Sequence, residues 1–172
     1  MKHKLSDWAN VAEIVGAVAI IVSLIYVSIQ VRDNTNAIKS AATNDAATAV
    51  QEWYMVLGSS EQTSKIFYNG MTKPESLTNE QMFQFMMIAH AGMLGFQNAF
   101  ELAEQGTLDP EIRDSITNTL AGTKDLPGYK IYWQQRGSQF NPQFREFIED
   151  LNARPTPTAA KIYQAEEEDS GQ

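Results

Sequence analysis

The pattern of apolar and polar positions begins with one long uncharged run near the N-terminus. Residues 14–31 number 18, carry no charge, and include 14 apolar side chains. A helix rises about 1.5 Å per residue, so this run spans about 27 Å, close to the hydrocarbon thickness of a bilayer. Arg32 and Asp33 end the run abruptly. The pattern therefore predicts a single transmembrane helix over residues 14–31, preceded by an N-terminal flank of residues 1–13.

Two other interpretations of the run stay open. A cleaved signal peptide also begins with basic residues, as Lys2 and Lys4 do here, but its apolar region is usually about 7–15 residues long and precedes a small-x-small cleavage site. The segment from Ser28 to Arg32 is a poor site of that kind. A buried core helix is the third interpretation, although β-branched residues dominate the run and no polar face follows it. We expect an uncleaved signal anchor.

Small and polar side chains recur on one face of the predicted span. They follow at i, i+4, i+7 and i+11, and one more polar residue extends the line; they are Ala12, Gly16, Ala19, Ser23 and Gln30. Small residues at this spacing allow a second helix to approach closely in lipid. We therefore expect a helix–helix interface here. Glu13, at the edge of the span, either reaches headgroup water or meets a cation of a partner.

The charges that flank the span bear on its orientation. Lys2 and Lys4 precede it, whereas Arg32 and Lys39 follow it. Because positive residues gather on the cytoplasmic side, this small bias favours a cytoplasmic N-terminus. The remainder of the chain is then expected on the periplasmic side.

Helical periodicity continues beyond the span, and residues 32–152 are predicted to form a small, soluble, all-α domain. One apolar stripe suggests that the span extends as a long rod to about Gly58; it contains Ile38, Ala41, Ala42, Ala46, Val50, Trp53 and Leu57. Caps predict where the later helices start, namely at Ser60, Thr78 with Gln81, Asp109-Pro110, Pro127 and Asn141-Pro142. Glycines predict where helices end, at Gly58, Gly70, Gly106, Gly122 and Gly137.

The helix predicted over residues 79–105 is apolar nearly all round in its first half. A second span is the alternative, but Gln84 and His90 interrupt the apolar residues, and the charge-free part is about 15 residues long. A buried central helix fits that length better. We expect this helix to be the hub of the domain.

The composition changes after residue 152. Residues 153–172 contain a Pro/Thr linker and an acidic tail that ends in Glu166-Glu167-Glu168-Asp169-Ser170-Gly171-Gln172. Such tails are usually solvated. Between linker and acidic residues, Ile162 and Tyr163 are candidate contacts to a partner.

Charge and composition exclude several chemistries. The net charge of −8 disfavours nucleic-acid binding, and the lack of cysteine excludes disulfides, thiol catalysis and iron–sulfur sites. Only His3 and His90 are histidines, and no Glu-x-x-His pair, serine elbow or phosphate-binding glycine loop occurs. We therefore predict no catalytic residue, no metal ligand and no cofactor. His90 is expected to be a half-buried, hydrogen-bonded side chain.

The two ends of the chain resemble an uncharacterised bacterial family of single-span membrane proteins with a small C-terminal helical domain. The resemblance rests on the run from Val15 to Val27, on Gln30-Val31-Arg32-Asp33-Asn34-Thr35, and on Leu126-Pro127-Gly128, Trp133, Phe140, Phe144 and Phe147. It implies a bacterial membrane protein and carries no function. We expect a single-pass protein of the bacterial inner membrane. The middle of the chain is similar only in general character, and the acidic tail is a departure.

Two functions of different classes follow as expectations. The first is a non-enzymatic, membrane-anchored accessory or assembly subunit, which binds other integral membrane subunits, or itself, through its span and helical domain. A respiratory or photosynthetic complex is one candidate host. The alternative is a membrane-anchored sensor whose helical domain binds a small ligand near the Met-rich central helix.

Overall fold

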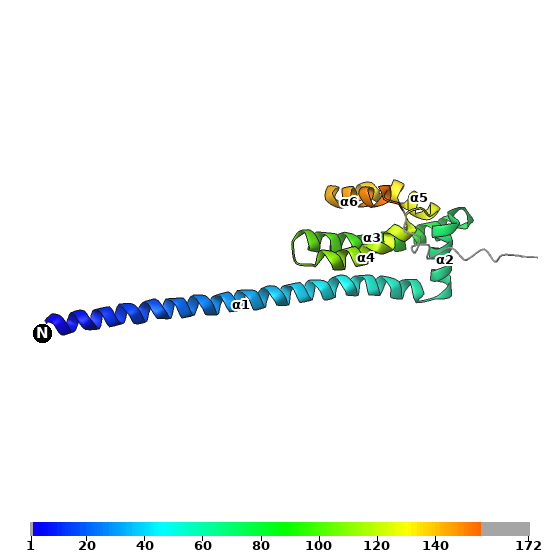
Figure 1. The fold of residues 1–172 in the computed structure, drawn as a ribbon. Helices are drawn as coiled ribbons and strands as arrows, with labels where there is room; N and C mark the ends of the chain where they lie inside the picture. The colour runs from blue at the N-terminus through cyan, green and yellow to red at the C-terminus, as the bar shows by residue number, and fades with distance from the viewer. Residues whose placement is uncertain (1, 156–172) are drawn as a thin grey trace, which may run out of the picture. The chain divides into compact units, whose positions relative to one another are not determined.

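The fold is all-α, as expected, in a computed structural model that describes residues 2–155 (Figure 1). The helices are α1 (Lys2–Gly58), α2 (Glu61–Thr72), α3 (Asn79–Glu104), α4 (Pro110–Thr123), α5 (Pro127–Arg136) and α6 (Pro142–Ala153), with short 3-10 turns η1 (Pro74–Ser76) and η2 (Gly137–Gln139). The chain divides into two compact units, residues 1–41 and residues 42–172. The helix α1 contributes to both.

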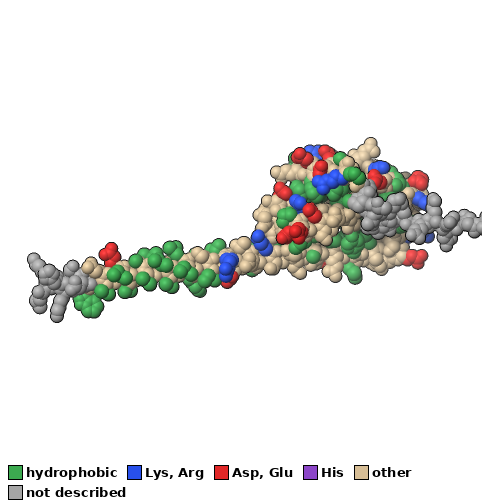
Figure 2. Space-filling view, in the orientation of Figure 1, with side chains coloured by type: hydrophobic (Ala, Val, Ile, Leu, Met, Phe, Trp, Pro, Cys, Tyr) green, Lys and Arg blue, Asp and Glu red, His purple; other side chains and the backbone are tan. Residues whose placement is uncertain are grey.

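The first unit consists of the N-terminal part of α1. Every side chain described from residue 10 to residue 41 is exposed, and hydrophobic ones follow one another along it in Figure 2. The hydroxyls of Ser23 and Ser28 donate hydrogen bonds of 2.8 Å to the carbonyl oxygens of Ala19 and Leu24, so these polar groups are satisfied within the helix itself. Among the described residues, α1 is the one helix long and apolar enough to cross a membrane.

The second unit begins with the last four turns of α1. Ala42 and Ala46 are buried, and Val50, Trp53 and Leu57 pack against the core of the bundle. This part of the predicted stripe is confirmed. Ile38 and Ala41, in contrast, are exposed, because they belong to the first unit.

Local capping signals set most helix starts. The Ser60 hydroxyl accepts the Thr63 amide, and Thr78 forms a capping box with Gln81. The carboxylate of Asp109 and the side-chain oxygen of Asn141 cap α4 and α6, each of which has proline at its first position. The predicted starts of α2, α3, α4, α5 and α6 are therefore confirmed.

Two of the glycines expected at helix ends lie inside helices: Gly122 is one residue short of the end of α4, and Gly70 is two residues short of the end of α2, for a reason of packing. Gly70 does not end α2, which continues to Thr72. Gly70 is buried because α5 crosses here: a Cβ on Gly128 would collide with the carbonyl oxygen of Gly70, and a Cβ on Gly70 would collide with the ring of Phe85. Glycine at position 70 leaves room for the ring of Phe85 rather than forming a turn, and glycine at position 128 allows the backbones of α2 and α5 to approach closely.

The central helix α3 is the hub of the bundle, as predicted. It contacts α2, α4, α5 and α6. Its buried residues are Phe85, Met86, Gly92, Met93, Phe96, Ala99, Phe100 and Ala103. Aromatic side chains of α6 pack on its C-terminal half, where Phe100 contacts Phe144 and Phe147 with ring centroids 5.7 and 5.0 Å apart. The burial of these large side chains stabilises the bundle.

Candidate functional site: an exposed apolar helix and a cavity in the bundle

The apolar part of α1 is the first candidate site, since nothing in the described structure covers it. Ile14, Ile21 and Leu24 are 65%, 57% and 62% exposed. Each square ångström of apolar surface left in water costs roughly 25 cal/mol, and a helix surrounded by such side chains is consistent with a single membrane span.

The structure places all five residues of the predicted helix–helix interface on α1, and all are exposed: Ala12, Gly16, Ala19, Ser23 and Gln30. A Cβ on Gly16 would meet no atom within 4 Å. This face is therefore open to a second helix. Glu13 is exposed beside it. Ile162 and Tyr163 lie outside the described residues.

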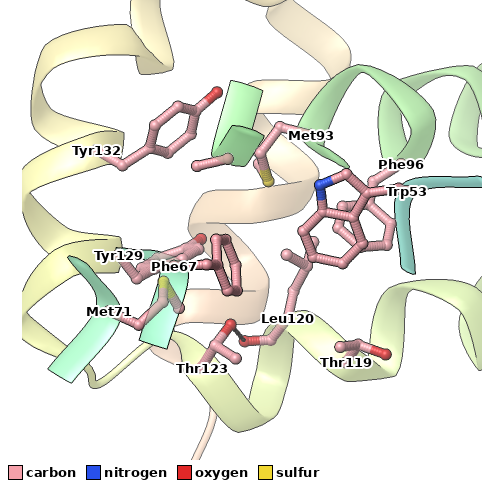
Figure 3. A pocket seen from close by; sticks show the side chains of 11 residues that line it. Trp53, Phe67, Met71, Met93, Phe96, Thr119, Leu120, Thr123, Tyr129 and Tyr132 are labelled. Atoms are coloured by element: carbon pink, nitrogen blue, oxygen red, sulfur yellow. Dashed lines mark hydrogen bonds between the residues drawn. The ribbon is translucent and has the colours of Figure 1, made fainter. Parts of the chain in front are cut away.

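The second candidate site is a cavity of about 40 Å³ within the bundle, between α1, α2, α3, α4 and α5. Figure 3 shows Trp53 and Phe96 on one side of it, and Phe67, Met71 and Tyr129 on the other. The complete lining is Trp53, Phe67, Met71, Ala89, Met93, Phe96, Thr119, Leu120, Thr123, Tyr129 and Tyr132. Most of this wall is hydrocarbon, aromatic ring or thioether.

The polar side chains of the lining are already paired with protein atoms. The indole Nε1 of Trp53 donates to the carbonyl oxygen of Ile88 at 2.8 Å, and the Thr123 hydroxyl donates to the Leu120 carbonyl oxygen at 3.2 Å. The hydroxyl of Thr119 lies 3.3 Å from that of Tyr54. These pairings leave the cavity an apolar interior.

The two tyrosines of the lining bond to groups elsewhere in the bundle. The Tyr129 hydroxyl donates to Oδ1 of Asn152 at 3.1 Å, and the Tyr132 hydroxyl lies 2.8 Å from Nδ1 of His90. Burial raises the pKa of Tyr129 to about 12, and burial likewise raises the pKa of Tyr132. Both phenols are therefore neutral at physiological pH.

His90 is half-buried and hydrogen-bonded, as the sequence predicted. Its ring packs against Phe140, with centroids 5.4 Å apart. Burial lowers the pKa of His90 below its usual value, and the positive charge of Arg136 lowers it further. The imidazole is therefore neutral at pH 7 and above.

Sequence reasoning missed the long-range polar contacts of the bundle, of which three involve Trp53, Asn141 and Lys124. Besides the bond from Trp53, Nδ2 of Asn141 donates to a carboxylate oxygen of Glu101 at 2.6 Å. The third contact involves Lys124, which is 5% exposed and donates to the carbonyl oxygens of Leu151, Asn152 and Arg154. Lys124 follows the end of α4, but the carbonyl oxygens that it binds belong to the end of α6, 27 residues further along the chain. A lysine after one helix is therefore a weak signal that it caps another.

Among the described residues, no three histidine or acidic side chains lie close enough together to hold a metal ion. Comparisons of the chain with protein-family models, with curated proteins and with solved structures found no match. The candidate sites therefore depend on geometry and chemistry alone.

Proposed function

We propose that the protein is a non-enzymatic, single-pass accessory or assembly subunit of an integral-membrane complex. The observation that supports this most is the uncovered apolar helix, in which residues 14–31 are exposed throughout. Lipid covers such a segment, and the open face at Gly16 then admits a helix of another subunit or of a second copy. The bundle contacts the partner outside the membrane.

The proposed location is the bacterial inner membrane, with the bundle in the periplasm. A first experiment tests the anchor: membranes that contain the full-length chain are washed with alkaline carbonate. We expect the intact chain to stay with the membrane pellet. Release of the intact chain into the supernatant would overturn the proposal.

A second experiment tests the interface with two matched substitutions. Gly16→Leu places a large side chain on the small-residue face, whereas Ala17→Leu places the same side chain about 100° round the helix. We expect crosslinking and co-elution with membrane subunits, or with a second copy, to be lost for Gly16→Leu and kept for Ala17→Leu. Equal complex formation by both variants, with both inserted, would reject this face.

Orientation is tested by cysteine labelling, because the native chain has no cysteine to interfere. Ser138 is exposed on η2, which makes Ser138→Cys a suitable reporter. We expect a membrane-impermeant maleimide to label it in cells whose outer membrane alone is permeabilised. Labelling only after lysis of the inner membrane would place the bundle in the cytoplasm.

The alternative, a sensor for a metabolite, has less support from the bundle. Ligand pockets usually have volumes of about 300–1,000 Å³. The cavity behind Trp53 has about 40 Å³, and the larger hollows beside Val56 and beside Met55, of about 390 and 440 Å³, are open to the surface. A monomeric chain whose thermal stability rises with a metabolite would favour the sensor over the subunit.

A further inference from the structure

The size of the bundle cavity limits what it can hold. Its volume is about 40 Å³. A cavity measured with a water-sized sphere needs about 10–15 Å³ to hold one water, and an engineered apolar cavity of about 150 Å³ binds benzene or xenon. The cavity behind Trp53 is thus larger than one water and much smaller than a benzene site.

The chemistry of the wall decides between water and an apolar guest. A buried water needs about 2–4 polar partners. Here Trp53, Thr123 and Tyr129 each donate their proton to a protein oxygen. The hydroxyl of Tyr132 points away from the rings of Phe67 and Tyr129 in Figure 3, and it lies beside His90. With these protons engaged, an entering water finds only hydroxyl oxygens as acceptors in a wall that is mostly apolar.

The same wall suits a polarisable apolar guest. Thioether sulfur and aromatic rings are themselves polarisable, and Met71, Met93, Phe67 and Phe96 supply them around one space. A guest there would gain the dispersion contacts that the wall atoms otherwise lack. It would also displace no ordered protein group.

We propose that this cavity binds one small apolar molecule, of the size of a xenon atom or a diatomic gas. The site is independent of the proposed anchoring function, since its lining lies wholly within residues 42–155.

The test uses xenon as the probe and methionine methyl groups as reporters. The full chain is labelled with ¹³C in its methionine methyls and placed in lipid nanodiscs under increasing xenon pressure. Met71 and Met93 line the cavity, whereas Met55 is 69% exposed and serves as the internal reference. We expect shifts at Met71 and Met93 that saturate with pressure, and none of comparable size at Met55.

Two matched variants locate the effect. Ala89 lines the cavity, whereas Ala91, on the same helix, is exposed and does not. Ala89→Val fills the space, and we expect it to abolish the saturable shifts of Met71 and Met93. Ala91→Val has the same cost in helix propensity, and we expect it to leave these shifts unchanged. Leu120→Ala enlarges the cavity and should saturate at lower pressure, which provides a second measurement if Ala89→Val does not fold.

The proposal fails if xenon leaves the Met71 and Met93 signals unchanged in the native chain. It also fails if their shifts rise linearly without saturation, as the reference does. Shifts of equal size in folded Ala89→Val, or weaker binding in Leu120→Ala, would likewise overturn it.

Discussion

The indole nitrogen of Trp53, near the end of α1, donates a hydrogen bond of 2.8 Å to the backbone carbonyl oxygen of Ile88 in α3. The two residues are 35 positions apart in the chain. The indole fits there because Gly92, one turn further along α3, has no side chain: a Cβ at that position would lie 2.6 Å from Cε2 of Trp53. This contact fixes the last turns of α1 on the bundle.

Trp53→Phe should remove the hydrogen bond and keep an aromatic ring. We expect a loss of about 1 kcal/mol in the free energy of unfolding, the usual net contribution of one hydrogen bond, plus a smaller loss of packing. Chemical denaturation of the full chain in mild detergent, followed by far-UV circular dichroism of the bundle, measures it. An unchanged midpoint would contradict the contact.

Gly92→Ala should destabilise the bundle by about 1–3 kcal/mol, because the new methyl group displaces the Trp53 ring. Gly95→Ala is the matched control on α3, since nothing lies within 4 Å of its added Cβ. In the interior of a helix that control should stabilise by about 0.5–1 kcal/mol. Thermal unfolding of the two variants should therefore shift in opposite directions, and shifts in the same direction would refute the close approach.

Gly128→Ala should be the most damaging small substitution in the described chain. Its Cβ would meet the backbone of Gly70 and Met71 rather than a flexible side chain, so α5 would have to move away from α2. We expect a loss above about 3 kcal/mol, at the upper end for overpacking. Protease resistance of the bundle provides the measurement, and a variant as resistant as the native chain would show that the two helices do not cross here.

The stability of the bundle should depend on the charge of His90. Its pKa is lowered in the folded state from 6.5, so the unfolded chain binds a proton more readily. The stability contributed by neutral His90 is therefore present above that pH and is lost as the pH falls through the folded-state pKa. We expect the melting temperature to fall more steeply for the native chain than for His90→Gln below about pH 6.5. His3→Gln serves as the control, and parallel curves for all three proteins would reject the effect.

Lys124→Met should loosen the end of α6, because Nζ of Lys124 donates to three carbonyl oxygens there. Hydrogen bonds from a charged donor contribute about 1.5–3 kcal/mol, and we expect a loss in that range. Hydrogen exchange of the amides from residue 148 to residue 153 should accelerate. Lys130→Met, at an exposed position of α5, should leave that exchange unchanged.

The sequence allowed good prediction of features that depend on neighbouring residues. Thr78 and Gln81 form a capping box three residues apart, and Asp109 caps a helix that begins at the next residue, so no tertiary information was needed. The sequence predicted that His90 is hydrogen-bonded but could not identify Tyr132 as its partner, because that contact depends on how α5 crosses α3. Gly70 shows the same limit: its role is decided by the ring of Phe85 on α3, and not by its neighbours in the chain.

The hydrogen bonds of Lys124 also connect two parts of the bundle that are far apart in the chain. Leu151 and Asn152 belong to the last turn of α6 and Arg154 follows it, and their carbonyl oxygens are held at the start of the loop between α4 and α5. The end of α6 therefore cannot leave the core without breaking hydrogen bonds to a buried ammonium group, which joins the last described helix to the end of α4.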